Sequence, residues 1–182
     1  NVLWQQIFGG AGTEYGYNCL TISDWYLVIG YTTSLGAGSK DVYLIKMDLE
    51  GNKIWEKTYG GILHDASYDY QGITMLETAD ANLIIIGNTL SFGTGDFDAW
   101  ILKINSGGEI VWQKTYGGNN RDAICSIQKT SDSGYITAGT TSSFGVMGNN
   151  IWVMKLNSSG NIIWQKTYGG DDYNSAKSIR ET

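Results

Sequence analysis

Carboxylates set among glycines are the residues of this chain best suited to chemistry. Asp96 and Asp98 flank a single phenylalanine, and Asp171 and Asp172 follow directly on a pair of glycines. Carboxylate and backbone carbonyl oxygens are the ligands that Ca²⁺ prefers in proteins. A calcium ion held by Asp96 and Asp98 is therefore the cofactor hypothesis, although neither pair completes a calcium-loop pattern. The interpretation that we favour is that these aspartates are turn residues on a solvated, acidic surface.

The aromatic and acidic segment Ile62–Tyr70 contains the only histidine of the chain. Aromatic rings stack on apolar faces of a sugar or a protein, whereas a lone histidine without a positioned serine or cysteine makes a poor catalytic triad. The alternative, which we favour, is a loop that varies without a function. Candidate binding residues come from this loop and its neighbours: His64, Asp65, Asp69, Tyr70, Asp96, Asp98, Asp122, Asp171 and Asp172.

No catalytic residue is predicted. Glycoside hydrolysis requires two carboxylates at a defined separation, and nothing in the sequence singles out one pair among the acidic loops. The position of Asp122 corresponds to Glu14 and Asn174 elsewhere in the chain. This variation indicates a surface loop that drifts, and the chain is therefore not expected to be an enzyme.

Composition excludes several classes of protein. The chain has 18 Asp and Glu against 12 Lys and Arg, a formal charge of −6, whereas a nucleic-acid surface shows clustered Lys and Arg. No apolar run approaches the roughly 20 residues of a membrane-spanning helix. Cys19 and Cys125 lie far apart with no CxxC spacing, so a metal or redox site is not expected and both are predicted to be small buried residues.

An internal repeat organises the whole chain. The heptapeptide Trp-Glu-Lys-Thr-Tyr-Gly-Gly that begins at Trp55 recurs nearly unchanged from Trp112 and Trp164, and in degenerate form from Trp4. The period is about fifty residues, which is typical of solenoids and propellers.

Each period is predicted to contain four short strands, which in the third are Ile124–Lys129, Tyr135–Thr141, Ile151–Leu156 and Asn161–Tyr168. The third strand is apolar on both faces, which indicates a sheet sandwiched between two layers. Lysines recur within these apolar strands, at Lys46, Lys103 and Lys155, and each is expected to have a carboxylate or carbonyl partner in its own repeat because a buried, unpaired lysine is costly.

Four-stranded sheets repeated at this period predict an all-β fold, a β-propeller with four-stranded antiparallel blades. A β-sandwich or another β-solenoid is the alternative. The expected blades are residues 14–60, 66–117 and 122–169, with the outer strand of a preceding blade at 2–8 and the inner strand of a following blade at 175–182. Three blades do not close a ring, so we expect other blades of the same chain, or a second copy, to complete it.

The repeat unit resembles the SBBP-like, or quinoprotein-like, tandem propellers of bacterial and archaeal secreted and cell-surface proteins. It carries an Asp or Asn, a glycine and a tryptophan in each copy, followed by Lys-Thr-Tyr-Gly-Gly and later by Ser-Phe-Gly. Similar positions form the tryptophan-docking motif of quinone dehydrogenases, where the Trp packs between blades. Here they are Asp48, Gly51 and Trp55; Asn105, Gly108 and Trp112; and Asn157, Gly160 and Trp164.

The resemblance implies blade packing and an extracellular or cell-surface location. It does not imply a quinone site, because the adjacent cysteine pair of those enzymes is absent. The expected function is a non-catalytic module for protein or glycan recognition, adhesion or scaffolding. Two alternatives stay open: part of a quinoprotein- or glycosidase-like enzyme whose catalytic residues lie outside this segment, and a self-assembling surface or filament subunit.

Overall fold

The computed structural model of the chain describes residues 2–66 and 73–181, and its regular elements there are all β-strands. The first meander comprises β1 (Glu14–Ile22), β2 (Trp25–Thr32), β3 (Lys40–Asp48) and β4 (Lys53–Tyr59). The second comprises β5 (His64–Ala66), β6 (Thr74–Glu77), β7 (Leu83–Thr89), β8 (Asp98–Ile104) and β9 (Ile110–Tyr116). The third comprises β10 (Asp122–Lys129), β11 (Tyr135–Thr141), β12 (Asn150–Leu156) and β13 (Ile162–Tyr168). The all-β prediction is confirmed, and no helix within these ranges is long and apolar enough to span a membrane.

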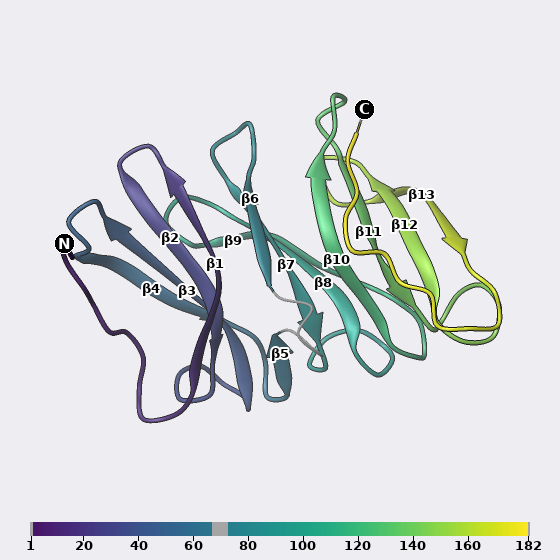
Figure 1. Cartoon of the computed structure of the whole chain (residues 1–182), viewed down its shortest axis with the longest axis horizontal. Coiled ribbons are helices and arrows are strands. Elements are labelled where there is room, and N and C mark those ends of the chain that lie inside the picture. The colour runs from purple at the N-terminus through teal and green to yellow at the C-terminus, as the bar shows by residue number, and fades with distance from the viewer. Residues whose placement is uncertain (1, 67–72, 182) are drawn as a thin grey trace.

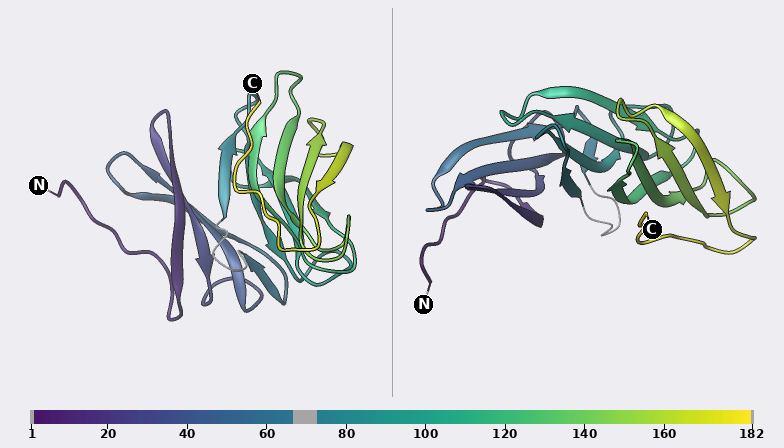
Figure 2. Two further views of the ribbon diagram at one scale, coloured as in Figure 1. Left: turned by 45° about the vertical axis from the view of Figure 1, so that its right-hand side comes forward. Right: turned by 90° about the horizontal axis from the view of Figure 1, so that it is seen from above.

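Consecutive strands pair antiparallel in the first meander, β1–β2–β3–β4, and in the third, β10–β11–β12–β13, and in the second from β6 to β9. The short strand β5 pairs parallel with β3 and antiparallel with β7, and this joins the first two meanders into one nine-stranded sheet. The third meander is a separate four-stranded sheet. Figure 1 shows the meanders side by side, and the right-hand view in Figure 2 shows them following one another along a curve.

Two hydrophobic cores lie between successive meanders. Along β7 and β8 the side chains alternate between them: Ile85 and Leu102 belong to the core shared with the first meander, and Ile84 and Ile101 to the core shared with the third. Every residue of β8 is therefore buried. In β12 buried and half-buried residues alternate instead, since one face of this strand has no further meander against it. The sandwiched third strand predicted from the apolar runs is confirmed for the central repeat.

The two chain ends differ from the prediction. Residues 2–8 and 175–181 form no strand, because a strand needs a neighbour with which to exchange backbone hydrogen bonds. The prediction that both cysteines are buried is also wrong, because Cys19 on β1 is exposed and Cys125 is half-buried.

Candidate functional site at the loop end of the repeats

Two of the predicted binding carboxylates are structural parts of their own loops. Asp122, at the start of β10, is buried and accepts hydrogen bonds from the amide of Gly118 at 2.8 Å, from the hydroxyl of Ser143 at 2.5 Å and from the hydroxyl of Thr141. Such a carboxylate ties together the two loops that flank its strand. Asp65, at the corresponding position of the second meander, is equally buried and is held by the same set: Gly61, Thr89 and Ser91.

Glu14 occupies this position in the first meander, where it accepts hydrogen bonds from Thr32 and Ser34. Hydrogen bonds from these two hydroxyls hold the pKa of Glu14 below its ordinary value. The position therefore keeps one role in all three meanders, and the interpretation of Asp122 as part of a drifting surface loop is wrong. The sequence contains a signal of this role, because a threonine followed two residues later by a serine recurs where β2, β7 and β11 end.

A second set of carboxylates begins the third strands. Asp98, at the start of β8, is buried, and its Oδ2 accepts a hydrogen bond from the amide of Thr94 at 2.9 Å. Asp41 does the same with the amides of Ala37 and Gly38. The Oδ1 atoms of both aspartates are buried without a hydrogen-bond partner. Burial raises the pKa of Asp98 and of Asp41 above the ordinary carboxyl value, and the nearby carboxylates of Asp122 and Asp65 raise it further.

The two sets meet at the end of each meander. A Cβ atom on Gly117 would lie 2.0 Å from Oδ1 of Asp98 and 2.8 Å from Oδ2 of Asp122. Only a residue without a side chain fits there, which explains the first glycine of each Gly-Gly pair. In the third repeat the paired positions carry Asn150 and Asn174, and both amides lie beside Gly169. The pairs are thus enclosed packing features beneath the loops.

The remaining predicted residues lie nearer the surface. Asp96 is exposed and forms an ion pair of 3.6 Å with Arg121, whose guanidinium lies 5.7 Å from the ring centre of Phe97. The ring of His64 meets the opposite side of the same cluster, edge-on to Phe97 with ring centres 5.3 Å apart. Asp96 and Asp98 therefore have different partners. Within residues 2–66 and 73–181 no group of three metal-ligating side chains comes together.

A shallow depression of about 460 Å³ lies between the loops of the second and third meanders. The backbone carbonyls of Asp171 and Asp172 lie 3.5 and 3.6 Å from the position of a Cβ on Gly148, which is one of its lining residues. Asp69 and Tyr70 fall outside the described residues. The depression is lined by polar side chains and one glycine: Asp96, Asn119, Asn120, Arg121, Ser142, Gly148 and Asn149.

Sequence reasoning missed a second cavity, of about 530 Å³, at the opposite end of the same two meanders. It lies between the β6–β7 and β10–β11 turns, and Lys103 and Tyr135 line it. Lys103 forms an ion pair of 2.8 Å with Asp80, and Lys155 one of 2.6 Å with Asp132. The predicted carboxylate partners of these two repeated lysines are confirmed. Lys103 and Asp80, which both line the cavity, are therefore bound to each other.

Lys46 is held differently in the first meander. Its Nζ lies 3.1 Å from the ring centre of Trp25 and donates a hydrogen bond to the carbonyl oxygen of Ser106. The β1–β2 turn has only two residues between its strands, fewer than the corresponding turns of the other meanders. The aromatic ring thus takes the place that a turn aspartate has in the other two repeats.

Comparisons with known proteins yield little. No family model matches the chain, and no curated protein does. A solved structure of a protein of unknown function from Bacteroides caccae aligns with a TM-score of 0.43 at 12% identity, covering 86% of this chain and 47% of that one. A structure described as the eukaryotic initiation factor aligns with a TM-score of 0.44 at 10% identity, covering 87% and 33%. The chain thus spans less than half of either structure, and similarity at this level supports no statement about fold or function.

Proposed function

We propose that the chain forms three blades of a β-propeller and acts as a non-catalytic recognition module. Support for the architecture comes from the three consecutive antiparallel meanders, each packed face to face on the next through a hydrophobic core. The repeat of about fifty residues suits one four-stranded blade. In this arrangement the loops that enter each first strand and each third strand lie at one end, where ligands are bound.

The binding surface that we propose is the polar depression at this end, and the observation that carries the proposal is its lining. A guanidinium, a carboxylate, a hydroxyl and several carboxamides converge there from loops of two different repeats. Side chains of this kind form hydrogen bonds with the hydroxyl groups of a carbohydrate. Tyr173, which follows Asp172 in the chain, is 68% exposed and has an aromatic ring of the kind that stacks on the apolar face of a sugar. A glycan is therefore the proposed ligand.

The carboxylates also favour binding over catalysis. A hydrolytic site needs an acid and a base that reach the substrate. Asp98 and Asp122 lie next to each other at Gly117, yet both side chains are buried. Asp96, which is exposed, is ion-paired with Arg121. An extracellular or cell-surface location is part of the proposal and depends on the family resemblance of the repeats.

The experiment is a glycan array followed by calorimetric titration of any glycan that binds. Arg121→Ala removes a charge from the depression, and Arg180→Ala removes the same charge from the exposed C-terminal segment near the opposite end. We expect Arg121→Ala to weaken binding at least about tenfold and Arg180→Ala to leave it unchanged. Binding that survives EDTA would argue against a calcium ion at Asp96. A chain that binds no glycan, or binds equally well as Arg121→Ala, would contradict the proposal.

A further inference from the structure

Besides the hydrophobic cores, a recurring polar contact joins successive meanders, between the last strand of one meander and the turn before the last strand of the next. Tyr59 on β4 donates a hydrogen bond of 2.9 Å to the carbonyl oxygen of Gly108, and Lys57 binds the side chain of Glu109. The same contact recurs one repeat later. There Tyr116 donates to the carbonyl oxygen of Gly160 at 2.6 Å, and Lys114 donates to the side chain of Asn161.

The tryptophan of the motif completes this contact. A Cβ on Gly160 would lie 2.9 Å from the ring of Trp112, so the glycine of the turn lets the indole approach the backbone. Gly160 has φ of +75°, the left-handed conformation that favours glycine. The Trp, Lys and Tyr side chains on one face of a last strand thus fit against a turn whose final glycine is followed by a polar residue.

The corresponding face of β13 has no such turn against it among residues 2–66 and 73–181. Trp164, Lys166 and Tyr168 on β13 repeat the residues of β4 and β9, but Trp164 is 40% exposed and Tyr168 is 53% exposed. Tyr116, its counterpart in the preceding repeat, is only 6% exposed. The face is therefore complementary to one more turn of the same kind.

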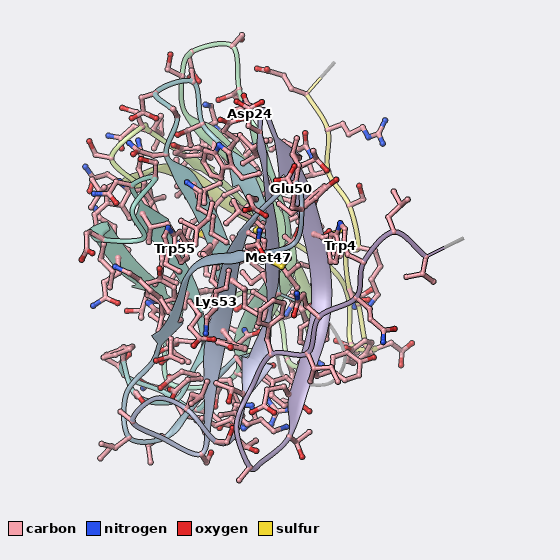
Figure 3. The ribbon with its side chains drawn as sticks, turned by 90° about the vertical axis from the view of Figure 1, so that its left-hand side faces the viewer. Trp4, Asp24, Met47, Glu50, Lys53 and Trp55 are labelled. Carbon is pink, nitrogen blue, oxygen red and sulfur yellow. The ribbon has the colours of Figure 1, made fainter. Side chains whose placement is uncertain are left out.

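A turn of this kind is incompletely occupied at the other end of the molecule, between β3 and β4. There Trp4 donates its indole hydrogen to the carbonyl oxygen of Leu49 at 3.2 Å, and its ring would lie 2.6 Å from a Cβ on Gly51. Figure 3 looks onto this end, with Trp4 on the N-terminal segment beside the turn that carries Glu50. The segment that supplies Trp4 forms no strand.

The N-terminal segment also lacks two groups of the motif. Gln6 stands where the other repeats have lysine, and Phe8 where they have tyrosine. Phe8 has no hydroxyl with which to reach the carbonyl oxygen of Gly51. The Gln6 side chain is shorter than lysine and uncharged, whereas an ammonium binds Glu109 or Asn161 in the other two contacts. The N-terminal segment is accordingly a weaker partner of the β3–β4 turn than β13 would be.

We propose that β13 of one copy docks on the β3–β4 turn of a second copy and displaces Trp4. In the docked state Trp164 packs on Gly51 of the second copy, Tyr168 donates to its carbonyl oxygen, and Lys166 meets the side chain of Asn52. The two surfaces lie at opposite ends of the fold (Figure 1), so the contact joins copies head to tail. The proposal depends on the repeat contacts alone and is independent of the glycan site.

The test is sedimentation velocity of the full 182-residue chain over a range of concentrations, with three variants. Trp164→Ala removes the docking indole and is expected to weaken association at least about tenfold. Trp4→Ala vacates the turn and is expected to strengthen it. Met147→Ala, which truncates a side chain that is 89% exposed in a loop, is expected to change nothing. Tyr168→Phe removes only a hydroxyl from an exposed position and is also expected to weaken association. It replaces Trp164→Ala in the test if that variant does not fold.

Chemical cross-linking of a mixture of isotope-labelled and unlabelled copies locates the contact. We expect a link between Lys166 of one copy and Lys53 of the other, since Lys53 follows Asn52. If the chain and its Trp4→Ala variant both stay monomeric at every concentration, a second copy is not the partner of β13. The partner would then be the turn of a further repeat in a longer chain. Association that neither Trp164→Ala nor Tyr168→Phe weakens would overturn the proposed surface.

Discussion

The hydroxyl of Tyr116 donates a hydrogen bond of 2.6 Å to the carbonyl oxygen of Gly160, which belongs to the following repeat. The tyrosine is buried, and burial raises the pKa of its hydroxyl well above the ordinary value. The hydroxyl therefore remains a neutral donor over the whole physiological pH range. This bond fixes the last strand of one meander against the turn of the next, where the hydrophobic core alone would allow sliding.

Tyr116→Phe is expected to lower the free energy of unfolding by about 1 kcal/mol, because a buried carbonyl loses its donor while the ring remains in place. Urea denaturation measures the change. Tyr168→Phe is the matched control, because Tyr168 is exposed and its hydroxyl has no turn to meet in a single copy. The measurement is made at a concentration below that of any self-association. Equal effects of the two substitutions would contradict the role assigned to the Tyr116 hydroxyl.

Gly117→Ala is expected to destabilise the chain by roughly 2–3 kcal/mol, because the new methyl group would overlap the carboxylates of Asp98 and Asp122. Neither carboxylate can move without breaking the hydrogen bonds that hold its loop. Gly170→Ala is the control, since a Cβ there has nothing within 4 Å. Thermal unfolding of both variants tests the prediction. A Gly117→Ala variant as stable as Gly170→Ala would show that the carboxylates are not packed against this glycine.

Asp98→Asn is expected to stabilise the protein at neutral pH by about 1 kcal/mol. The amide oxygen can keep the hydrogen bond from Thr94, and the new NH₂ group can face Asp122 from the position of the unpaired Oδ1. Asp122→Asn is expected to destabilise by about 2 kcal/mol, because its carboxylate already receives donors on both oxygens. If both substitutions lowered stability at pH 7, the interpretation that Oδ1 of Asp98 is buried without a hydrogen-bond partner would be contradicted.

The pH dependence of Asp98→Asn follows from the raised pKa of Asp98. A raised native pKa means that the native state holds its proton more tightly than the unfolded chain, so stability falls as pH rises from the ordinary carboxyl value through the native value. Below that window the carboxyl is neutral in both states. The advantage of the asparagine is therefore expected at pH 7 and is expected to shrink near pH 4, which melting curves at the two pH values can show.

Asp80→Ala is expected to lower stability by about 1–2 kcal/mol at pH 7, because it leaves the nearly buried ammonium of Lys103 without its carboxylate. The figure is below that of a fully buried pair because the Asp80 side chain is half exposed. The hydrogen bond from Lys103 lowers the pKa of Asp80, so its contribution is present above the ordinary carboxyl pKa and is lost as pH falls.

The difference in the free energy of unfolding between the wild type and Asp80→Ala should therefore become smaller in acid. The native state lowers the pKa of Asp80 but raises that of Asp98, so the two carboxyls have opposite pH dependence. Asp24→Ala, in the corresponding turn of the first meander, is the control because Lys46 there lies over Trp25. Asp24→Ala is expected to change stability by less than about 0.5 kcal/mol. If Asp24→Ala lowered stability as much as Asp80→Ala, the stabilising role of the ion pair between Asp80 and Lys103 would be contradicted.

The meanders could be predicted because their signals are local. The repeated Trp-Lys-Tyr strand, the apolar run around Lys103 and the turn residues Ser131–Gly134 each lie within a few positions of the element that they define. The strand Tyr135–Thr141 matches the structure at both ends. The partners of Lys103 and Lys155 could likewise be predicted from the sequence, because a buried ammonium requires a carboxylate and the nearest turn supplies one.

The candidate site was harder to predict because its residues look alike in sequence and differ only in tertiary surroundings. Asp96 and Asp98 are two positions apart, yet one is exposed and the other is buried. Two donors that hold Asp122 come from Thr141, at the end of β11, and Ser143, in the loop that follows, about twenty residues further along the chain. Asn119 and Asn120, which line the depression, carried no recognisable motif.

A titration of the ¹⁵N-labelled chain with a glycan that it binds, followed by two-dimensional NMR, decides whether the loop end is the binding surface. Binding at the loop end predicts shifts of the amides of Asn119, Asn120, Arg121 and Asn149, which border the depression. The cavity beside Lys103 and Tyr135 at the opposite end serves as the internal control, and its amides should not move. Shifts confined to the residues around Lys103 and Tyr135 would contradict the account and place the ligand at the other end.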